Sequence, residues 1–288
     1  MTSSLEPCYL LSHTLVFFLC FGFITVNVNT SSDYNLIYKK CINQTFINPN
    51  GPLLSEFLSS LFQELIPQSS QSKFFETSVG DETAAIYGFF QCREDLSNGD
   101  CYNCVSKVAQ MSNSLCGETI PTRVQLSGCY IHYEADGSEA SGVELLHKTC
   151  SESKAVVSSG FADVRDGAFA GLEKGVIAAD NGFVDMEYKS LMHVMAQCEG
   201  NLGGGCDCGD CVSAAVRIAE DECGYSLSGQ VYLHNCFITY TYNANSFPEN
   251  GTGSNSGKLV AIGVGGLAVL LFGLAILYFI RKQKSDDW

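Results

Sequence analysis

Cysteines separated by two residues are the feature of this sequence most able to do chemistry. Cys101 and Cys104 form one such pair, and Cys208 and Cys211 form another. This spacing suits zinc binding, thiol–disulfide exchange or structural disulfides. These three chemistries need different surroundings, so the neighbouring residues distinguish between them.

Zinc and redox chemistry both fit the surroundings poorly. A closed zinc site needs four nitrogen or sulfur ligands, and no histidine stands at matching places beside the two pairs. A redox-active pair usually lies in a βαβ context, which the flanking sequence does not show. We therefore predict structural disulfides, with no metal ion and no cofactor.

The histidines do not form a catalytic constellation. No aspartate or serine stands near them at matching positions in both copies. An isolated histidine is usually a packing or surface residue. The residues concerned are His132, His147, His193 and His234. We expect that the protein is not an enzyme.

The cysteines recur because the chain contains a tandem duplication. Most matched cysteines are displaced by 107 residues, and the flanking residues repeat as well, as in Gln91-Cys92 and Gln197-Cys198. The matched positions are Cys41 and Cys150, Cys92 and Cys198, Cys101 and Cys208, Cys104 and Cys211, Cys116 and Cys223, and Cys129 and Cys236. Six cysteines per copy allow fifteen pairings, and their spacing leaves all of these open.

Cys206 has no counterpart in the first copy. It either competes with Cys208 for a partner, stays free, or forms a disulfide with another chain.

Each copy contains helical and strand-like patterns that can position the cysteines. Apolar residues recur at helical spacing from Leu54 to Leu65 and from Phe161 to Val176, and a second helix should begin near Cys104. Alternating β-branched and aromatic residues over 123–134 and 230–242 favour β structure. We predict an α+β fold of tandem domains, with helices packed on antiparallel sheets.

Two apolar segments frame the duplication. Residues 1–30 are predicted to be a signal peptide cleaved between Val26 and Ser32, with an uncleaved anchor as the alternative. Residues 259–280 carry no charge and are long enough to span a bilayer. The basic residues that follow place the tail, 281–288, in the cytoplasm. The domains are then 31–140 and 141–244, followed by a stalk, 245–258.

Charge and composition exclude some classes of protein. The net charge of −15 argues against nucleic acid as a partner, because phosphates need a basic surface. A hydrophobic fraction of 46% argues against disorder over most of the chain.

The spacing Cys92-x8-Cys101-x2-Cys104, which returns as Cys198-x9-Cys208-x2-Cys211, resembles the plant cysteine-rich repeat related to the ginkgo-seed antifungal lectin. Two such domains, one spanning segment and a short tail are similar to the plasmodesmata-located protein family. The resemblance implies that each domain packs two helices on a five-stranded antiparallel sheet. It also implies the pairs Cys41–Cys116, Cys92–Cys101, Cys104–Cys129, Cys150–Cys223, Cys198–Cys208 and Cys211–Cys236.

The lectin relative binds mannose through an asparagine, an arginine and a glutamate. The first copy keeps Arg123 and Glu134 at these positions but has Ile42 in place of the asparagine. The second copy has Ser151, Gln230 and Thr241, so it has lost all three. A sugar site that lacks hydrogen-bonding partners binds weakly. Arg123 and Glu134 are thus weak ligand candidates, and a structural ion pair across the sheet is the alternative.

The resemblance implies a protein of the plasma membrane at plasmodesmata, with its ectodomain in the apoplast. Such a protein would regulate cell-to-cell trafficking through callose control and recruited partners. Callose synthase, viral movement proteins and other members of the family are the expected partners. A membrane-tethered lectin or antifungal protein that binds cell-wall glycan is the alternative function.

Two further features concern modification and assembly. Asn43 and Asn250 begin glycosylation motifs that suit a secreted domain. Ala261 and Gly265 place small residues four apart in the predicted span, a spacing that favours association between membrane helices.

Overall fold

The computed structural model describes residues 34–43, 54–81, 84–135, 142–157, 160–202 and 204–243. The first copy comprises β1 (Leu36–Cys41), α2 (Leu54–Gln68), β2 (Phe74–Asp81), β3 (Ala84–Cys92), α3 (Asn98–Cys116), β4 (Thr122–Leu126) and β5 (Cys129–Glu134). The second comprises β6 (Leu145–Cys150), α4 (Phe161–Ala178), β7 (Phe183–Tyr188), β8 (Met192–Cys198), α5 (Cys206–Ile218), the π-helical turn η2 (Ala219–Cys223), β9 (Ser228–Leu233) and β10 (Cys236–Tyr242).

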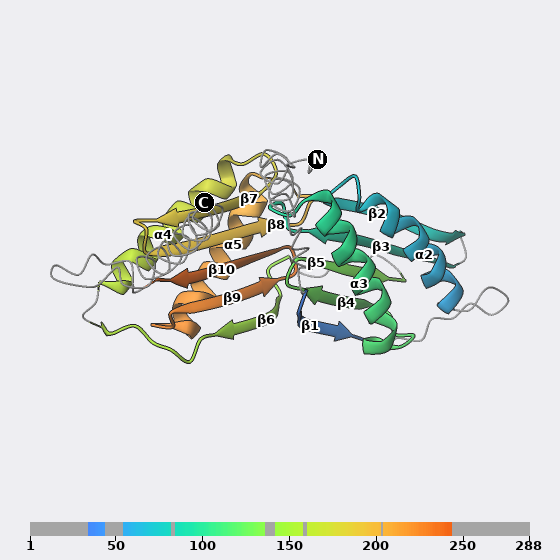
Figure 1. The fold of residues 1–288 in the computed structure, drawn as a ribbon, viewed down its shortest axis with the longest axis horizontal. Helices are drawn as coiled ribbons and strands as arrows, with labels where there is room; N and C mark the ends of the chain where they lie inside the picture. The colour runs from blue at the N-terminus through green and yellow to red at the C-terminus, as the bar shows by residue number, and fades with distance from the viewer. Residues whose placement is uncertain are drawn as a thin grey trace, which may run out of the picture.

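Both copies have the same sheet topology. The strand orders are β1-β4-β5-β3-β2 and β6-β9-β10-β8-β7, and every neighbouring pair is antiparallel. The predicted α+β fold, with two five-stranded sheets, is therefore confirmed. The sheets lie end to end, with β1 beside β6, and α2 and α3 cover the front of one sheet while α5 lies behind the other (Figure 1). The helix-free faces of the two sheets consequently point to opposite sides of the molecule.

The predicted apolar stripes form the two hydrophobic cores. The buried residues of α2 are Leu54, Phe57, Leu58, Leu61 and Leu65. Those of α4 include Phe161, Val164, Phe169, Leu172 and Val176. Each stripe packs on the covered face of its own sheet, as a helix with one apolar face must.

Two local predictions needed correction. Helix α3 begins at Asn98 rather than near Cys104, because the Ser97 hydroxyl accepts a 3.0 Å hydrogen bond from the amide of Asp100 and caps the helix. The strand-like runs 123–134 and 230–242 each contain a hairpin, β4–β5 and β9–β10. The core-facing positions change from even numbers in β4, as at Val124 and Leu126, to odd numbers in β5, as at Cys129 and Ile131, so a shift in the phase of the alternation marks the turn.

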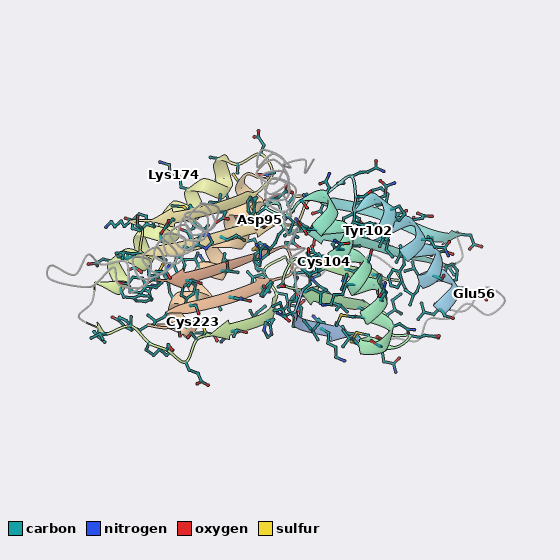
Figure 2. The ribbon with its side chains drawn as sticks, in the orientation of Figure 1. Glu56, Asp95, Tyr102, Cys104, Lys174 and Cys223 are labelled. Carbon is teal, nitrogen blue, oxygen red and sulfur yellow. A yellow bond between two sulfur atoms is a disulfide. The ribbon has the colours of Figure 1, made fainter. Side chains whose placement is uncertain are left out.

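Six disulfides join the helices to the sheets. They link Cys41 to Cys116, Cys92 to Cys101, Cys104 to Cys129, Cys150 to Cys223, Cys198 to Cys208 and Cys211 to Cys236, which are the pairs that the resemblance implies. Figure 2 labels Cys104 on α3 and Cys223 at the end of η2. The Cys41–Cys116 disulfide spans a sequence separation of 75. In the chain-entropy account, closing a loop of that length stabilises the fold by about 4 kcal/mol.

Several predicted features lie outside the described residues. They are the signal peptide 1–30, the stalk 245–258, the span 259–280, the tail 281–288, and the positions Asn250, Ala261 and Gly265. Among the residues that the structure describes, no helix combines the length and the apolar character needed to cross a bilayer.

Three glycines spaced four residues apart let α4 lie close to β7. A Cβ atom at Gly167 would lie 2.4 Å from the Tyr188 hydroxyl, and one at Gly175 would lie 2.9 Å from Cγ2 of Val184. At Gly171 the nearest atom is Cε of Met186, at 3.1 Å. The neighbours differ in stiffness, because valine is restricted at χ1 whereas methionine is flexible.

We predict that Gly175→Ala lowers the melting temperature, whereas Gly171→Ala leaves it unchanged or raises it. Crowding Val184 costs about 1–3 kcal/mol, which exceeds the gain of about 1 kcal/mol from replacing a helical glycine by alanine. At Gly171 the Met186 methyl group can move aside, so the helical gain prevails. Thermal unfolding of the purified variants measures the difference. Equal shifts in both variants would contradict this account of the contact between α4 and β7.

Candidate functional site

The two repeats meet through matching glutamines at the ends of β3 and β8. The side-chain amide of Gln91 donates to the carbonyl of Cys198 at 2.9 Å, and that of Gln197 donates to the carbonyl of Cys92 at 3.0 Å. Both glutamines are buried. Each therefore satisfies a backbone carbonyl of the other repeat, and the exchange follows the approximate twofold relation between the two copies.

A buried ion pair breaks this symmetry. Arg123 of β4 lies 3.8 Å from the carboxylate of Glu199, and each side chain is only 6% exposed. The Arg123 guanidinium donates to the carbonyl of His234 at 2.9 Å and lies 3.8 Å above the Tyr130 ring. The Tyr130 hydroxyl donates to Glu199 at 2.7 Å. Burial opposes the charge on Arg123, but Tyr38, Tyr130 and Glu199 favour it and raise the guanidinium pKa above its ordinary value.

Aromatic side chains close the junction beside the ion pair. Tyr38 of β1 stacks on His147 of β6, with ring centroids 5.3 Å apart and planes 15° apart. These two residues occupy equivalent positions in the two repeats. Tyr232 lies 5.6 Å from Tyr38. Burial is the main cause that raises the pKa of both tyrosines, so both hydroxyls stay protonated at neutral pH.

Two hollows flank the junction, each on the helix-free face of one sheet. The first-sheet hollow has a volume of about 180 Å³, and its lining includes Lys40, Arg123, His132 and Glu134. The second-sheet hollow has a volume of about 590 Å³. The equivalent positions in its lining are Thr149, Gln230, Thr239 and Thr241. At these four equivalent positions the first-sheet hollow carries charged or titratable side chains and the second-sheet hollow carries neutral ones, while Arg93 of the first repeat also lines the second-sheet hollow.

The first-sheet hollow holds charges that are mostly paired. Lys40 forms a 2.6 Å ion pair with Glu144 of the second repeat, and His132 lies 3.5 Å from the carboxylate of Glu134. Nε of Arg123 and Nδ1 of His132 are buried without a hydrogen-bond partner among the described residues. Nε of Arg123 is a donor, and a neutral His132 that donates from Nε2 toward Glu134 leaves Nδ1 as an acceptor, so a hydroxyl group could bond to both nitrogens.

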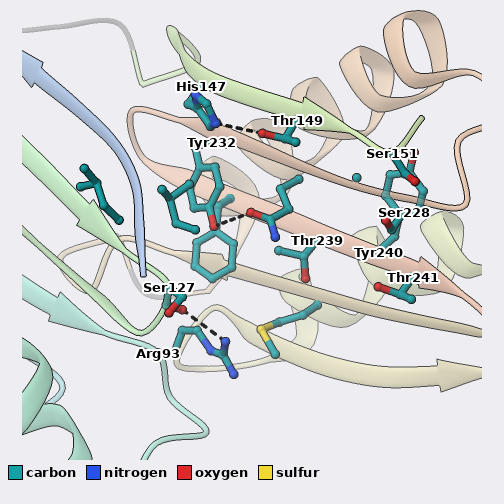
Figure 3. Close-up of a pocket in the computed structure, with 16 residues that line it drawn as sticks. Arg93, Ser127, His147, Thr149, Ser151, Ser228, Tyr232, Thr239, Tyr240 and Thr241 are labelled. Atoms are coloured by element: carbon teal, nitrogen blue, oxygen red, sulfur yellow. Dashed lines mark hydrogen bonds between the residues drawn. The ribbon is translucent and has the colours of Figure 1, made fainter. Parts of the chain in front are cut away.

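The second-sheet hollow combines hydroxyl groups with an aromatic surface (Figure 3). Tyr232 and Phe237 stack there, with ring centroids 5.4 Å apart and planes 25° apart. The Tyr232 hydroxyl donates to the side-chain oxygen of Gln230 at 3.2 Å, and Thr149 lies 2.9 Å from Nε2 of His147. Arg93 also lines this hollow and forms an ion pair with Asp95. The hydroxyl and amide groups beside an apolar ring suit a hydroxylated ligand.

The structure brings the weak ligand candidates together in one hollow. Arg123, Glu134 and Ile42 all line the first-sheet hollow. The alternative interpretation, a structural ion pair between Arg123 and Glu134, is wrong, because Arg123 pairs with Glu199 and Glu134 with His132. The second-repeat counterparts Ser151, Gln230 and Thr241 likewise line one hollow.

The remaining predicted positions lie away from the junction. Cys206 is exposed, forms no disulfide with another cysteine of the described ranges, and begins α5. The competition with Cys208 does not arise, because Cys208 pairs with Cys198. Asn43 is exposed and lies next to the first sheet through a bridge to Ile120.

Sequence reasoning missed the residues of the junction. The repeated Gln-Cys dipeptide was visible in the sequence, but nothing local showed that the glutamines cross to the other repeat. A second signal was the reversal of charge at equivalent positions, since Arg93 of the first copy corresponds to Glu199 of the second. Such a reversal indicates that the two copies have different surroundings.

We predict that His234→Gln makes the protein less sensitive to acid. Burial, followed by the charges of Arg123 and His132, lowers the pKa of His234 from 6.5 to about 4. The unfolded chain therefore takes up a proton between these pH values that the folded protein does not, and stability falls as pH falls. Allowing for partial exposure, wild type should lose about 1–2 kcal/mol more than the variant between pH 7 and pH 4.

Denaturant unfolding of both proteins at the two pH values measures this difference. The carboxylates titrate in both proteins and cancel in the comparison. Equal losses of stability in the two proteins would show that the pKa of His234 is the same in the folded and unfolded states.

Comparison with known proteins places this architecture in a family. The salt stress response/antifungal domain family matches residues 31–136 and 149–243. Plasmodesmata-located protein 2 of Arabidopsis thaliana is 41% identical over 96% of this chain and 97% of its own length, and plasmodesmata-located protein 1 is 39% identical over 96% and 98%. The crystal structure of the tandem DUF26 ectodomain of an Arabidopsis thaliana cysteine-rich receptor-like protein superposes with a TM-score of 0.64. It is 26% identical and covers 72% of this chain and 98% of its own. The chain belongs to the plasmodesmata-located protein family, with two salt stress response/antifungal domains in tandem.

Proposed function

We propose that this protein acts at plasmodesmata, where it regulates trafficking between cells. The observation that carries this proposal is the similarity to plasmodesmata-located protein 2, which extends over 96% of this chain. A match confined to one cysteine-rich domain would support only a shared fold. Similarity along nearly the full length of both proteins supports a shared location as well.

The proposed topology is that of a type I membrane protein in the plasma membrane. Residues 259–280 carry no charge, and Arg281, Lys282 and Lys284 follow them. An uncharged segment of this length suits a spanning helix, and basic residues favour the cytoplasmic side. The disulfide-bonded repeats then lie in the apoplast, an oxidising compartment in which disulfides persist.

Regulation in this proposal works through partners rather than through chemistry on a substrate. The proposed partners are membrane or wall proteins of the same family, callose synthase and viral movement proteins, with callose control as the outcome. The bonds across the junction support this role, because they present both repeats to a partner as one continuous surface.

We predict that a fluorescent fusion of the full chain in leaf epidermis forms wall puncta that coincide with callose. The matched control is a fusion that ends at Asn243, which keeps both repeats but lacks the proposed span. The control should spread through the apoplast. Uniform plasma-membrane fluorescence from the full chain would overturn the proposal.

Binding of a cell-wall glycan is a second candidate function, and the second-sheet hollow favours it. Its lining combines Thr149, Gln230, Thr239 and Thr241 with the stacked rings of Tyr232 and Phe237. Hydroxyl and amide groups can exchange hydrogen bonds with sugar hydroxyls, while an aromatic ring covers the apolar face of a sugar. Arg93 in the lining is paired with Asp95, so its charge is matched within the protein and the hollow suits a neutral saccharide.

We predict that a neutral oligosaccharide on a glycan array retains the wild-type protein, and that Thr241→Val weakens this binding several-fold. Loss of one hydrogen bond to a ligand corresponds to about 1 kcal/mol. The matched control is Glu134→Gln, at the equivalent position of the first repeat, which should bind like wild type. Equal loss of binding in both variants would contradict glycan binding at this hollow. So would an array on which no glycan retains the wild-type protein.

A further inference from the structure

Two neighbouring valines are among the most exposed large apolar residues that the structure describes. Val156 is 70% exposed and Val157 is 75% exposed, whereas the other exposed large apolar side chains of the described ranges lie between 38% and 53%. Both valines belong to the segment that follows β6 and precedes α4. Adjacent branched apolar side chains in water are unfavourable unless another apolar surface covers them.

Backbone hydrogen bonds tie this segment to the point where the described chain ends. The amide of Ala155 donates to the carbonyl of Tyr225 at 2.8 Å, and that of Leu227 donates to the carbonyl of Ser153 at 2.9 Å. The amide of Tyr242 in turn donates to the carbonyl of Leu227 at 2.7 Å. The valines and the end of β10 therefore lie at the same end of the second repeat, opposite the junction (Figure 1).

The length of chain beyond this point limits how far the end of the repeat can lie from a bilayer. Residues 244–258 separate Asn243 from the uncharged segment 259–280. For a linker of that length, the random-coil relation gives a root-mean-square span of about 20 Å. A tether this short gives even a weak contact a high effective concentration at the membrane surface.

We propose that Val156 and Val157 insert into the lipid surface of the bilayer that anchors the chain, and so hold the second repeat against the membrane. This inference rests on the single span of the proposed function. The first repeat then lies farthest from the membrane, and the two hollows face sideways on opposite sides of the molecule.

The contact is apolar rather than electrostatic. Nζ of Lys154 donates to the carbonyl of Cys223 and to the Ser226 hydroxyl, and Arg165 donates to the carbonyl of Gly224 and to Asp166. Lys154 and Arg165, at the same end of the second repeat as the valines, thus form their hydrogen bonds within the protein. Neutral phosphatidylcholine is therefore a sufficient membrane for the test.

The native tryptophan content makes a site-specific test available. Trp288 is the single tryptophan of the chain, so Trp288→Phe gives a background without tryptophan. Val157→Trp in this background places a reporter in the proposed contact. Ile177→Trp is the matched control, because Ile177 is 53% exposed and lies near the other end of α4, in contact range of Gly209.

Each full-length variant is reconstituted into phosphatidylcholine vesicles with bromine on the acyl chains, and into the same vesicles without bromine. We expect brominated lipid to reduce the emission of the tryptophan at position 157 about twofold, since interfacial side chains reach the upper acyl region. Emission from position 177 should not change. Equal emission from position 157 in both lipids overturns the proposal.

Flotation of the vesicles before the fluorescence measurement tests the membrane anchor separately from the contact between the valines and the lipid. Protein that fails to float with the vesicles overturns the membrane anchor, and the lipid contact with it. Protein that floats but shows no quenching at position 157 overturns the contact alone and leaves the plasmodesmal function in place.

Discussion

Reciprocal hydrogen bonds hold the two repeats together as one body: the Gln91 side chain donates to the Cys198 carbonyl, and the Gln197 side chain donates to the Cys92 carbonyl. Each glutamine lies near the end of an interior strand, directly before a disulfide-bonded cysteine. The disulfide fixes the strand end, and the fixed strand end presents its carbonyl to the other repeat. The junction therefore depends on the cysteines, although no cysteine crosses it.

The buried pair of Arg123 and Glu199 adds specificity to this junction. Taking two charges out of water costs several kcal/mol per ion, and the attraction repays that cost only when the remaining donors and acceptors are satisfied. Here Tyr130 donates to Glu199, and a backbone carbonyl accepts from Arg123. Because Arg93 stands where the second repeat has Glu199, pairing two copies of the first repeat would place Arg123 against Arg93. The ion pair therefore favours association of the first repeat with the second.

Duplication also gave the protein two versions of one hollow with different chemistry. The backbone, the sheet order and the flanking disulfides are retained in both copies. The side chains differ, because residues on the helix-free face make few contacts with the core and can change at little cost to stability. Lys40, Arg123 and Glu134 belong to a charged network that reaches the second repeat, whereas the equivalent side chains Thr149, Gln230 and Thr241 are neutral. The two faces of the molecule can therefore engage partners of different chemistry.

The sequence by itself determined the duplication, the set of bonded cysteines, the fold class and the buried faces of α2 and α4. These follow from spacing and periodicity, which report the local conformation of a segment and the face that it buries. Only the tertiary structure decided where α3 begins and which residues meet at the junction. Gln91, Arg123 and Glu199 lie far apart in sequence, and periodicity shows which face a side chain takes but not what covers that face. The pairing of Arg123 with Glu199 rather than with Glu134, and the two hollows beside it, arise from the packing of one repeat against the other.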